Sequence, residues 1–174
     1  HSMNPCYFGY TNSPLFGVYS APRVSQTRDA AVLICSPIAQ EYMRTHWAIR
    51  QLSSQLSDAG FHVLRFDYSG VGDSALDENT INVDLWLENI QLAAQELRDI
   101  SGAKRLIIVG LRMGSMLAAE ALSKKSIDAD QLILWDPVVQ GKSYLQQLEA
   151  LTNEIALDRT ATPKKTDYLL GFQF

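Results

Sequence analysis

The sequence is poor in cysteine and histidine, with two cysteines and three histidines among 174 residues. Cys6 and Cys35 form no CxxC pair, and so few ligand residues predict neither a disulfide framework nor a zinc site. We therefore expect no metal and no cofactor. A core must instead hold the fold together, and a chain of this length buries about 70% of its unfolded surface, which is sufficient for one domain.

Long apolar runs and an excess of basic charge are also missing. The longest apolar stretches, such as residues 106–109, are far shorter than a membrane span, and no basic segment followed by an apolar one opens the chain. The formal net charge is −4 and the pI is near 5.3, which gives no electrostatic footprint for nucleic acid or an anionic membrane. We expect a cytoplasmic protein whose partner is a small molecule.

The sequence does contain short apolar runs that alternate with long amphipathic stretches between Asp29 and Asp136. This alternation is typical of a mostly parallel sheet with helices on both faces, an α/β three-layer sandwich. The predicted strands are 30–36, 62–67, 105–109 and 131–135, and the predicted helices are 41–59, 81–100, 113–124 and 144–155. Before them, Cys6–Tyr10 and Leu15–Ser20 flank a short turn and predict an antiparallel hairpin.

Ligands of an open parallel sheet bind outside the carboxyl ends of its strands, so the turns at that edge are the candidate sites. The most informative turn is Gly110-Leu111-Arg112-Met113-Gly114, between an apolar strand and an Ala-rich helix. This is the context of the G-x-S-x-G nucleophile elbow, in which two glycines permit a tight turn around one strained residue. The residue at the tip is here Arg112.

The chain resembles an α/β-hydrolase-fold protein. GLRMG at 110–114 matches the elbow, DYSGVGDS at 67–74 matches a turn common after the fourth strand, and 35–41 lies where the fold places its oxyanion loop. More narrowly, GLRMGS, LILWDPVV at 132–139 and PIAQEYMR at 37–44 resemble the exosortase A system-associated hydrolase group. Members of that group carry arginine at the elbow and often lie among exopolysaccharide or natural-product genes.

The resemblance implies that ligand or oxyanion contacts come from two turns. One is the loop with Pro37, Ile38 and Glu41, and the other is the elbow with Met113 and Gly114. The backbone amides around Ile38 and Met113 are the expected oxyanion donors.

The arginine removes the usual serine mechanism, because a guanidinium stays protonated and cannot attack a carbonyl. Ser115 is the candidate substitute at the elbow, although it belongs to the first turn of the helix. Ser36 and Cys35 are either nucleophiles or packing residues. Asp136 is either the acid of a triad or a turn-forming residue before Pro137.

Two interpretations of Arg112 remain open. In one, it forms an internal ion pair with Glu41, Asp73 or Asp136. In the other, it joins the amides of Met113 and Gly114 to hold an anionic group, which would offset the cost of a cation at a helix N-terminus.

The histidines and tryptophans complete the candidate residues. His46 is expected on the first helix and His62 at the entrance of a strand, with neither placed to act as a triad base. Trp47, Trp86 and Trp135 are expected in the core, with Trp135 also a candidate pocket residue.

Two functions follow. The protein is a hydrolase or acyltransferase relative acting on an ester, thioester or amide of an acylated saccharide or metabolite, or it is a non-catalytic protein that binds an anionic ligand.

The expected domain division is a tag remnant at 1–3, the hydrolase core at 4–139 and the start of a cap at 140–174. The resemblance implies two further strands after Phe174, with the triad acid and the base histidine, so we expect a fragment. The strand at 131–135 would then be a sheet edge, and either the missing strands cover it or a second copy of the chain does, as a homodimer through that edge.

Overall fold

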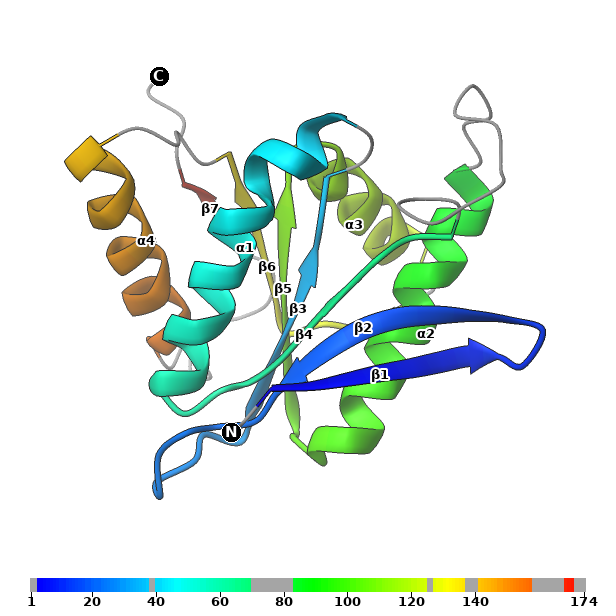
Figure 1. The fold of residues 1–174 in the computed structure, drawn as a ribbon, viewed down its shortest axis with the longest axis horizontal. Helices are drawn as coiled ribbons and strands as arrows, with labels where there is room; N and C mark the ends of the chain where they lie inside the picture. Colours follow the sequence, from blue (N-terminus) through cyan, green and yellow to red (C-terminus); the bar gives the residue numbers. More distant parts are fainter. Residues whose placement is uncertain are drawn as a thin grey trace.

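The computed structural model describes residues 3–37, 40–69, 83–124, 127–136, 141–157 and 168–170. They form a seven-stranded sheet in the order β1-β2-β4-β3-β5-β6-β7, with helices on both faces (Figure 1). The strands are β1 (Met3–Tyr10), β2 (Ser13–Ser20), β3 (Ala30–Cys35), β4 (His62–Phe66), β5 (Arg105–Leu111), β6 (Gln131–Trp135) and β7 (Tyr168–Leu170). The helices are α1 (Gln40–Asp58), α2 (Val83–Ser101), α3 (Met113–Ser123) and α4 (Gly141–Ala156). The predicted three-layer α/β arrangement is confirmed.

The antiparallel hairpin is also confirmed. β1 pairs with β2 up to Tyr10 opposite Ser13, so Thr11 and Asn12 form the turn. β2 then pairs antiparallel with β4, and the five strands from β3 to β7 are parallel to one another. Such parallel pairs require crossover connections, and the long helices between the apolar runs supply them.

The central strand β3 shows why the sequence does not alternate there. All six of its residues are at most 2% exposed. Leu33 and Cys35 pack in one core cluster with α2 and α3, while Val32 and Ile34 pack in a second cluster with α1 and α4. Because both faces of the strand are covered, every position must be apolar.

The carboxyl-terminal part of the chain differs from expectation. β7 pairs in parallel with Ile133–Trp135, so β6 is not a sheet edge, and the prediction that it forms one is wrong. One further parallel strand thus lies within this chain, before Phe174. Among the described residues of 140–174, α4 packs its Leu148, Leu151 and Ile155 into the second core cluster. These residues belong to the core layers, and the cap stays a prediction.

The tryptophans divide between core and surface. Trp86 is 8% exposed and Trp135 is 1% exposed, as expected for core residues. Trp47 is 49% exposed, so the prediction that it lies in the core is wrong. It belongs to α1, whose buried stripe runs through Ile49 and Leu52 instead.

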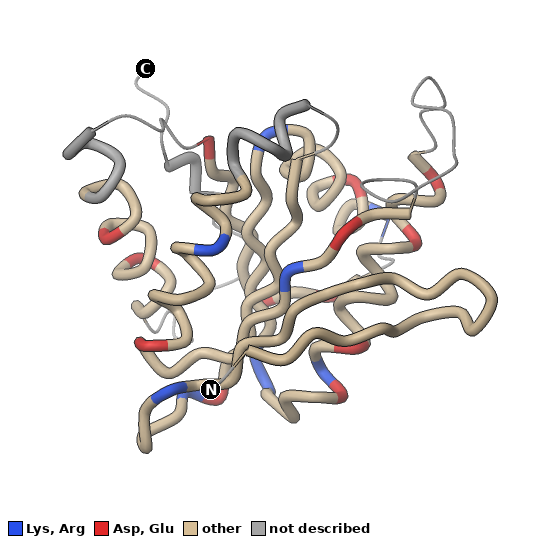
Figure 2. Tube along the Cα trace, in the orientation of Figure 1, with Lys and Arg blue, Asp and Glu red and all other residues tan. Residues whose placement is uncertain are grey.

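Charges of both signs are spread over the helices and the ends of the strands, while the central strands carry few (Figure 2). This mixture fits the small net charge of −4. None of the described helices is both long enough and apolar enough to cross a membrane.

Candidate functional site

The turn between β5 and α3 has the backbone of an elbow. Arg112 adopts φ 50° and ψ −117°, and it is the one non-glycine residue with positive φ in the described part of the chain. A side chain in this region of backbone space costs about 1–3 kcal/mol and persists only where the surroundings impose it. The strain at the tip, which the GLRMG pattern predicts, is therefore present.

The two glycines of the turn allow the close packing that imposes this strain. A Cβ on Gly110 would lie 2.6 Å from Ser115 Cα, and a Cβ on Gly114 would lie 2.2 Å from the Cys35 carbonyl oxygen and 2.6 Å from the Ser36 carbonyl oxygen. No rotamer change relieves a clash with backbone. Gly114 thus packs the start of α3 directly against the turn that follows β3.

Ser115 closes the turn from the helix side. Its hydroxyl donates a hydrogen bond to the Gly110 carbonyl oxygen at 2.7 Å, and its backbone N–H donates to the Arg112 carbonyl oxygen at 2.9 Å. Both bonds brace the elbow. The hydroxyl is engaged with the backbone in this arrangement, as a structural role requires, and its assignment as a nucleophile stays a prediction.

Arg112 and Asp136 come together across the carboxyl ends of β5 and β6. Arg112 Nε lies 3.2 Å from Asp136 Oδ1, with 42% of the arginine side chain and 33% of the aspartate side chain exposed. The contact is electrostatic, since Asp136 Oδ1 accepts no hydrogen bond from the described residues although it is buried. A partly exposed pair contributes about 0–1 kcal/mol, similar to the roughly 0.3–1 kcal/mol cost of a cation near a helix N-terminus.

Asp136 is thus one partner of Arg112, as the ion-pair interpretation predicted. Asp73 and the side chain of Glu41 lie outside the described residues. Pro37 is buried, whereas Ile38 also lies outside the described residues. Met113 is 41% exposed at the first position of α3, next to buried Gly114.

Cys35 is unsuited to act as the missing nucleophile. The residue is fully buried, and burial raises its thiol pKa to about 12, with the influence of Tyr68 acting in the opposite direction. The thiolate required for attack is therefore scarce at neutral pH. The burial therefore supports the interpretation of Cys35 as a packing residue.

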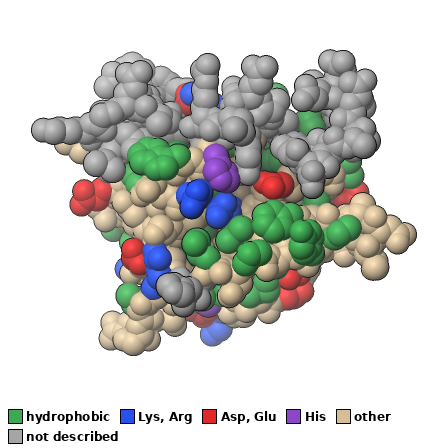
Figure 3. Space-filling model, viewed as in Figure 1, with side chains coloured by type: hydrophobic (Ala, Val, Ile, Leu, Met, Phe, Trp, Pro, Cys, Tyr) green, Lys and Arg blue, Asp and Glu red, His purple; other side chains and the backbone are tan. Residues whose placement is uncertain are grey.

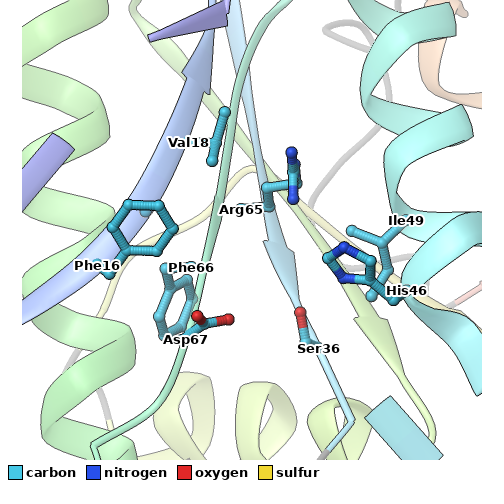
Figure 4. Close-up of a pocket in the computed structure, with 9 residues that line it drawn as sticks. Phe16, Val18, Ser36, His46, Ile49, Arg65, Phe66 and Asp67 are labelled. Atoms are coloured by element: carbon cyan, nitrogen blue, oxygen red, sulfur yellow. The ribbon is translucent and has the colours of Figure 1, made fainter. Parts of the chain in front are cut away.

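Sequence reasoning named Ser36 and His46 but did not predict that they meet Arg65 and Asp67 at this edge of the sheet. Ser36, His46, Arg65 and Asp67 line a pocket of about 60 Å³ with several apolar residues (Figure 4). His46 reaches it because the first half of a crossover helix lies at the carboxyl end of the preceding strand. The signal was available, since Arg65 and Asp67 share one face of an extended strand by period-2 alternation.

His46 is held toward its neutral form. Its pKa is lowered by burial and by the positive charges of Arg65 and Arg50, with Asp67 acting in the opposite direction. His62 lies at the other end of β4, where it shares a 2.6 Å hydrogen bond with the Tyr19 hydroxyl. Its pKa is also lowered by burial, and Asp29 opposes the shift. No group of three potential metal ligands occurs among the described residues.

Solved structures share this fold. An α/β serine hydrolase without a lid from Xanthomonas campestris matches with a TM-score of 0.62 and 15% identity, over 97% of this chain and 84% of that one. An α/β serine hydrolase homologue from Coxiella burnetii has a TM-score of 0.64 and 16% identity, over 96% and 86%. A thermostable carboxyl esterase from Bacillus coagulans has a TM-score of 0.59 and 17% identity, over 90% of this chain but 51% of that one.

Comparison with curated proteins finds no match. The family model described as serine aminopeptidase, S33 (Hydrolase_4) matches residues 26–168, a stretch that includes the elbow, Asp136 and the whole of the second core cluster. Since this is more than half of the chain, and the fold is that of the α/β serine hydrolases, the protein belongs to the serine aminopeptidase S33 family of α/β hydrolases.

Proposed function

We propose that the protein binds an anionic or acylated small molecule at the elbow, where Arg112 and the backbone amides of Met113 and Gly114 contact the anionic group. The observation that carries this proposal is the strained tip of the turn. An elbow at φ 50° presents one side chain above the sheet, and here that side chain is a cation with 42% exposure. The amides at a helix N-terminus favour an anion at the same place.

Asp136 acts as a positioning residue in this proposal. A guanidinium carries five N–H donors in a rigid fork, and Asp136 approaches it on the Nε side. The carboxylate thereby fixes the orientation of the fork above the turn. Carboxylate and phosphate groups match the spacing of two guanidinium N–H donors, so they are the ligand groups that we expect.

A second candidate is hydrolysis or acyl transfer on an ester, thioester or amide. Family membership and the intact elbow glycines favour it. Arg112 in place of a serine nucleophile weighs against it, as do the engaged hydroxyl of Ser115 and the protonated thiol of Cys35. GLRMGS further supports the exosortase A-associated group as the subfamily, which links the ligand to exopolysaccharide metabolism.

The first test measures inorganic phosphate binding by titration calorimetry. We expect Arg112→Ala to weaken binding at least about tenfold, because one charge-assisted hydrogen bond is worth about 1.5–3 kcal/mol. Arg112→Lys keeps the charge but loses the fork, so its affinity should be intermediate. Lys124→Ala is the matched control, since it removes a cation at the far end of α3. Phosphate binding that is unchanged in Arg112→Ala would overturn the proposal.

The second test separates binding from catalysis with p-nitrophenyl esters. We expect no turnover by the wild-type protein. Turnover that Ser115→Ala abolishes would favour the hydrolase candidate instead. Activity gained by Arg112→Ser would show that the remaining catalytic groups are present.

A further inference from the structure

One face of the β1–β2 hairpin is an exposed apolar surface. The two strands pair along their full length, and their side chains alternate between the two faces of the sheet. On one face, Phe8, Leu15 and Tyr19 pack into the first core cluster with α2. The opposite face, called the hairpin face below, consists of Met3, Pro5, Tyr7, Pro14, Phe16 and Val18.

The described helices leave the hairpin face largely exposed. The second core cluster, which lies on the α1 side of the sheet, contains no residue of β1 or β2. Tyr7 is 72% exposed, Met3 54% and Phe16 37%, and the centroids of the Tyr7 and Phe16 rings lie 5.5 Å apart. Figure 3 shows hydrophobic side chains gathered along the hairpin.

The hairpin carries no charged side chain. The sequence from Met3 to Pro22 contains no aspartate, glutamate, lysine or arginine, although 20% of the whole chain is charged. Figure 2 shows the hairpin without a charged residue. Charges begin on the neighbouring strand, where Arg65 lies opposite Val18 and the Asp67 N–H donates to the Phe16 carbonyl oxygen. An aromatic, uncharged centre with a charged rim is the composition of a protein–protein interface.

The open edge of β1 is poorly suited to pair with another strand. β1 is an end strand of the described sheet. Pro5 has no N–H to donate, and Gly9 at φ +87° interrupts the extended backbone. Such features limit strand pairing at a sheet edge. A partner is therefore expected to contact the hairpin face through side-chain packing.

We propose that the hairpin face binds the same face of a second copy of this chain, about a two-fold axis near Tyr7 and Phe16. In such a contact each surface meets itself, so any charge on it would lie near a like charge. The absence of charge meets this requirement, and it offers no complement to a charged partner. The formal net charge of −4 also disfavours an anionic lipid surface.

The exposed area fits a weak dimer. Complete burial of one aromatic side chain removes about 150–250 Å², so the partly exposed side chains of the hairpin face present on the order of 500 Å². Two copies would bury about 1,000 Å² in total, which is the lower limit for a specific interface. We therefore expect a dissociation constant in the micromolar range.

Sedimentation velocity of the whole chain, from about 1 µM to about 500 µM, tests the proposal. We expect a concentration-dependent shift from monomer to dimer. Tyr7→Lys should raise the dissociation constant at least about thirtyfold, because it replaces a central ring and brings two cations together. Tyr10→Lys is the matched control, since Tyr10 is an exposed tyrosine on the opposite face of the hairpin, and it should leave the constant unchanged.

An equal mixture of Tyr7→Lys and Tyr7→Glu should restore the dimer, because the two-fold axis then brings opposite charges together. Thermal melting close to that of the wild type establishes that each variant is folded. A wild-type chain that stays monomeric at the highest concentration would overturn the inference, as would a dimer that Tyr7→Lys leaves intact or a mixture that stays monomeric. Monomeric wild-type protein that co-sediments with phosphatidylcholine vesicles would assign the hairpin face to a lipid surface instead.

Discussion

At the scale of single residues, the elbow depends on the absence of a side chain at Gly110 and Gly114. A Cβ at Gly110 or Gly114 would overlap neighbouring backbone. The lack of these atoms lets α3 pack against the turn after β3, and this packing holds Arg112 at positive φ. The strain at Arg112 is therefore a product of tight packing. It does not require a serine at the tip.

Gly114→Ala should disrupt the fold severely. The added Cβ would lie 2.2 Å from a backbone carbonyl oxygen, so we expect the free energy of unfolding to fall by more than about 3 kcal/mol in urea denaturation. Gly102→Ala is the matched control, because Gly102 has φ +63° but no atom within 4 Å of the added Cβ. Its cost should be about 1–2 kcal/mol, from backbone conformation alone. Equal effects of the two changes would refute the packing argument.

At the scale of elements, α4 packs into the same core cluster as α1. Leu148 and Leu151 are completely buried in the cluster that also contains Leu52 and Leu56 of α1. The structure thus makes α4 a component of the three-layer sandwich.

Leu148→Ala tests this assignment. We expect the free energy of unfolding to fall by about 2–4 kcal/mol, the range for truncating a buried leucine. Glu149→Ala, an exposed change on the same helix, should alter it by less than about 0.5 kcal/mol. A loss below 1 kcal/mol for Leu148→Ala, measured in the same urea series, would indicate that α4 is not part of the core.

At the scale of the whole molecule, stability should depend on pH through two histidines. His46 and His62 both have pKa values lowered from 6.5, with burial as the main cause. Each binds its proton more weakly in the folded state than in the unfolded state. The contribution of the two neutral imidazoles to the free energy of unfolding is therefore complete above pH 6.5. It is lost as the pH falls through the lowered pKa values.

The free energy of unfolding should accordingly decrease when the pH is lowered below 6.5. Urea denaturation across this range measures the slope, and His46→Gln and His62→Gln should each flatten it. Stability that increases with acidification, or a slope that is unchanged in the double variant, would contradict the prediction. Glu120→Gln, an exposed change, provides the control.

The dimer also belongs to this scale. The homodimer was predicted because β6 was expected to be unpaired, but β7 pairs with Ile133–Trp135. The homodimer itself stays a prediction.

The sequence by itself determined the features that local patterns encode. Unbroken apolar runs specified the buried strands, the short turn predicted at 11–14 specified the hairpin, and two glycines around Arg112 specified a strained turn at the carboxyl edge. Each follows from constraints on a few neighbouring residues. Composition alone also excluded a disulfide framework as the basis of stability.

Only the tertiary structure decided which distant residues meet. It paired Arg112 with Asp136, brought Ser36, His46 and Asp67 to one pocket, left Trp47 at the surface and placed Tyr168–Leu170 beside β6. Helix rotation and the stacking of layers set these contacts, and both depend on packing against residues far away in the chain. Local periodicity carries no such information. The sequence therefore predicted the candidate residues of the site but not which of them lie in contact.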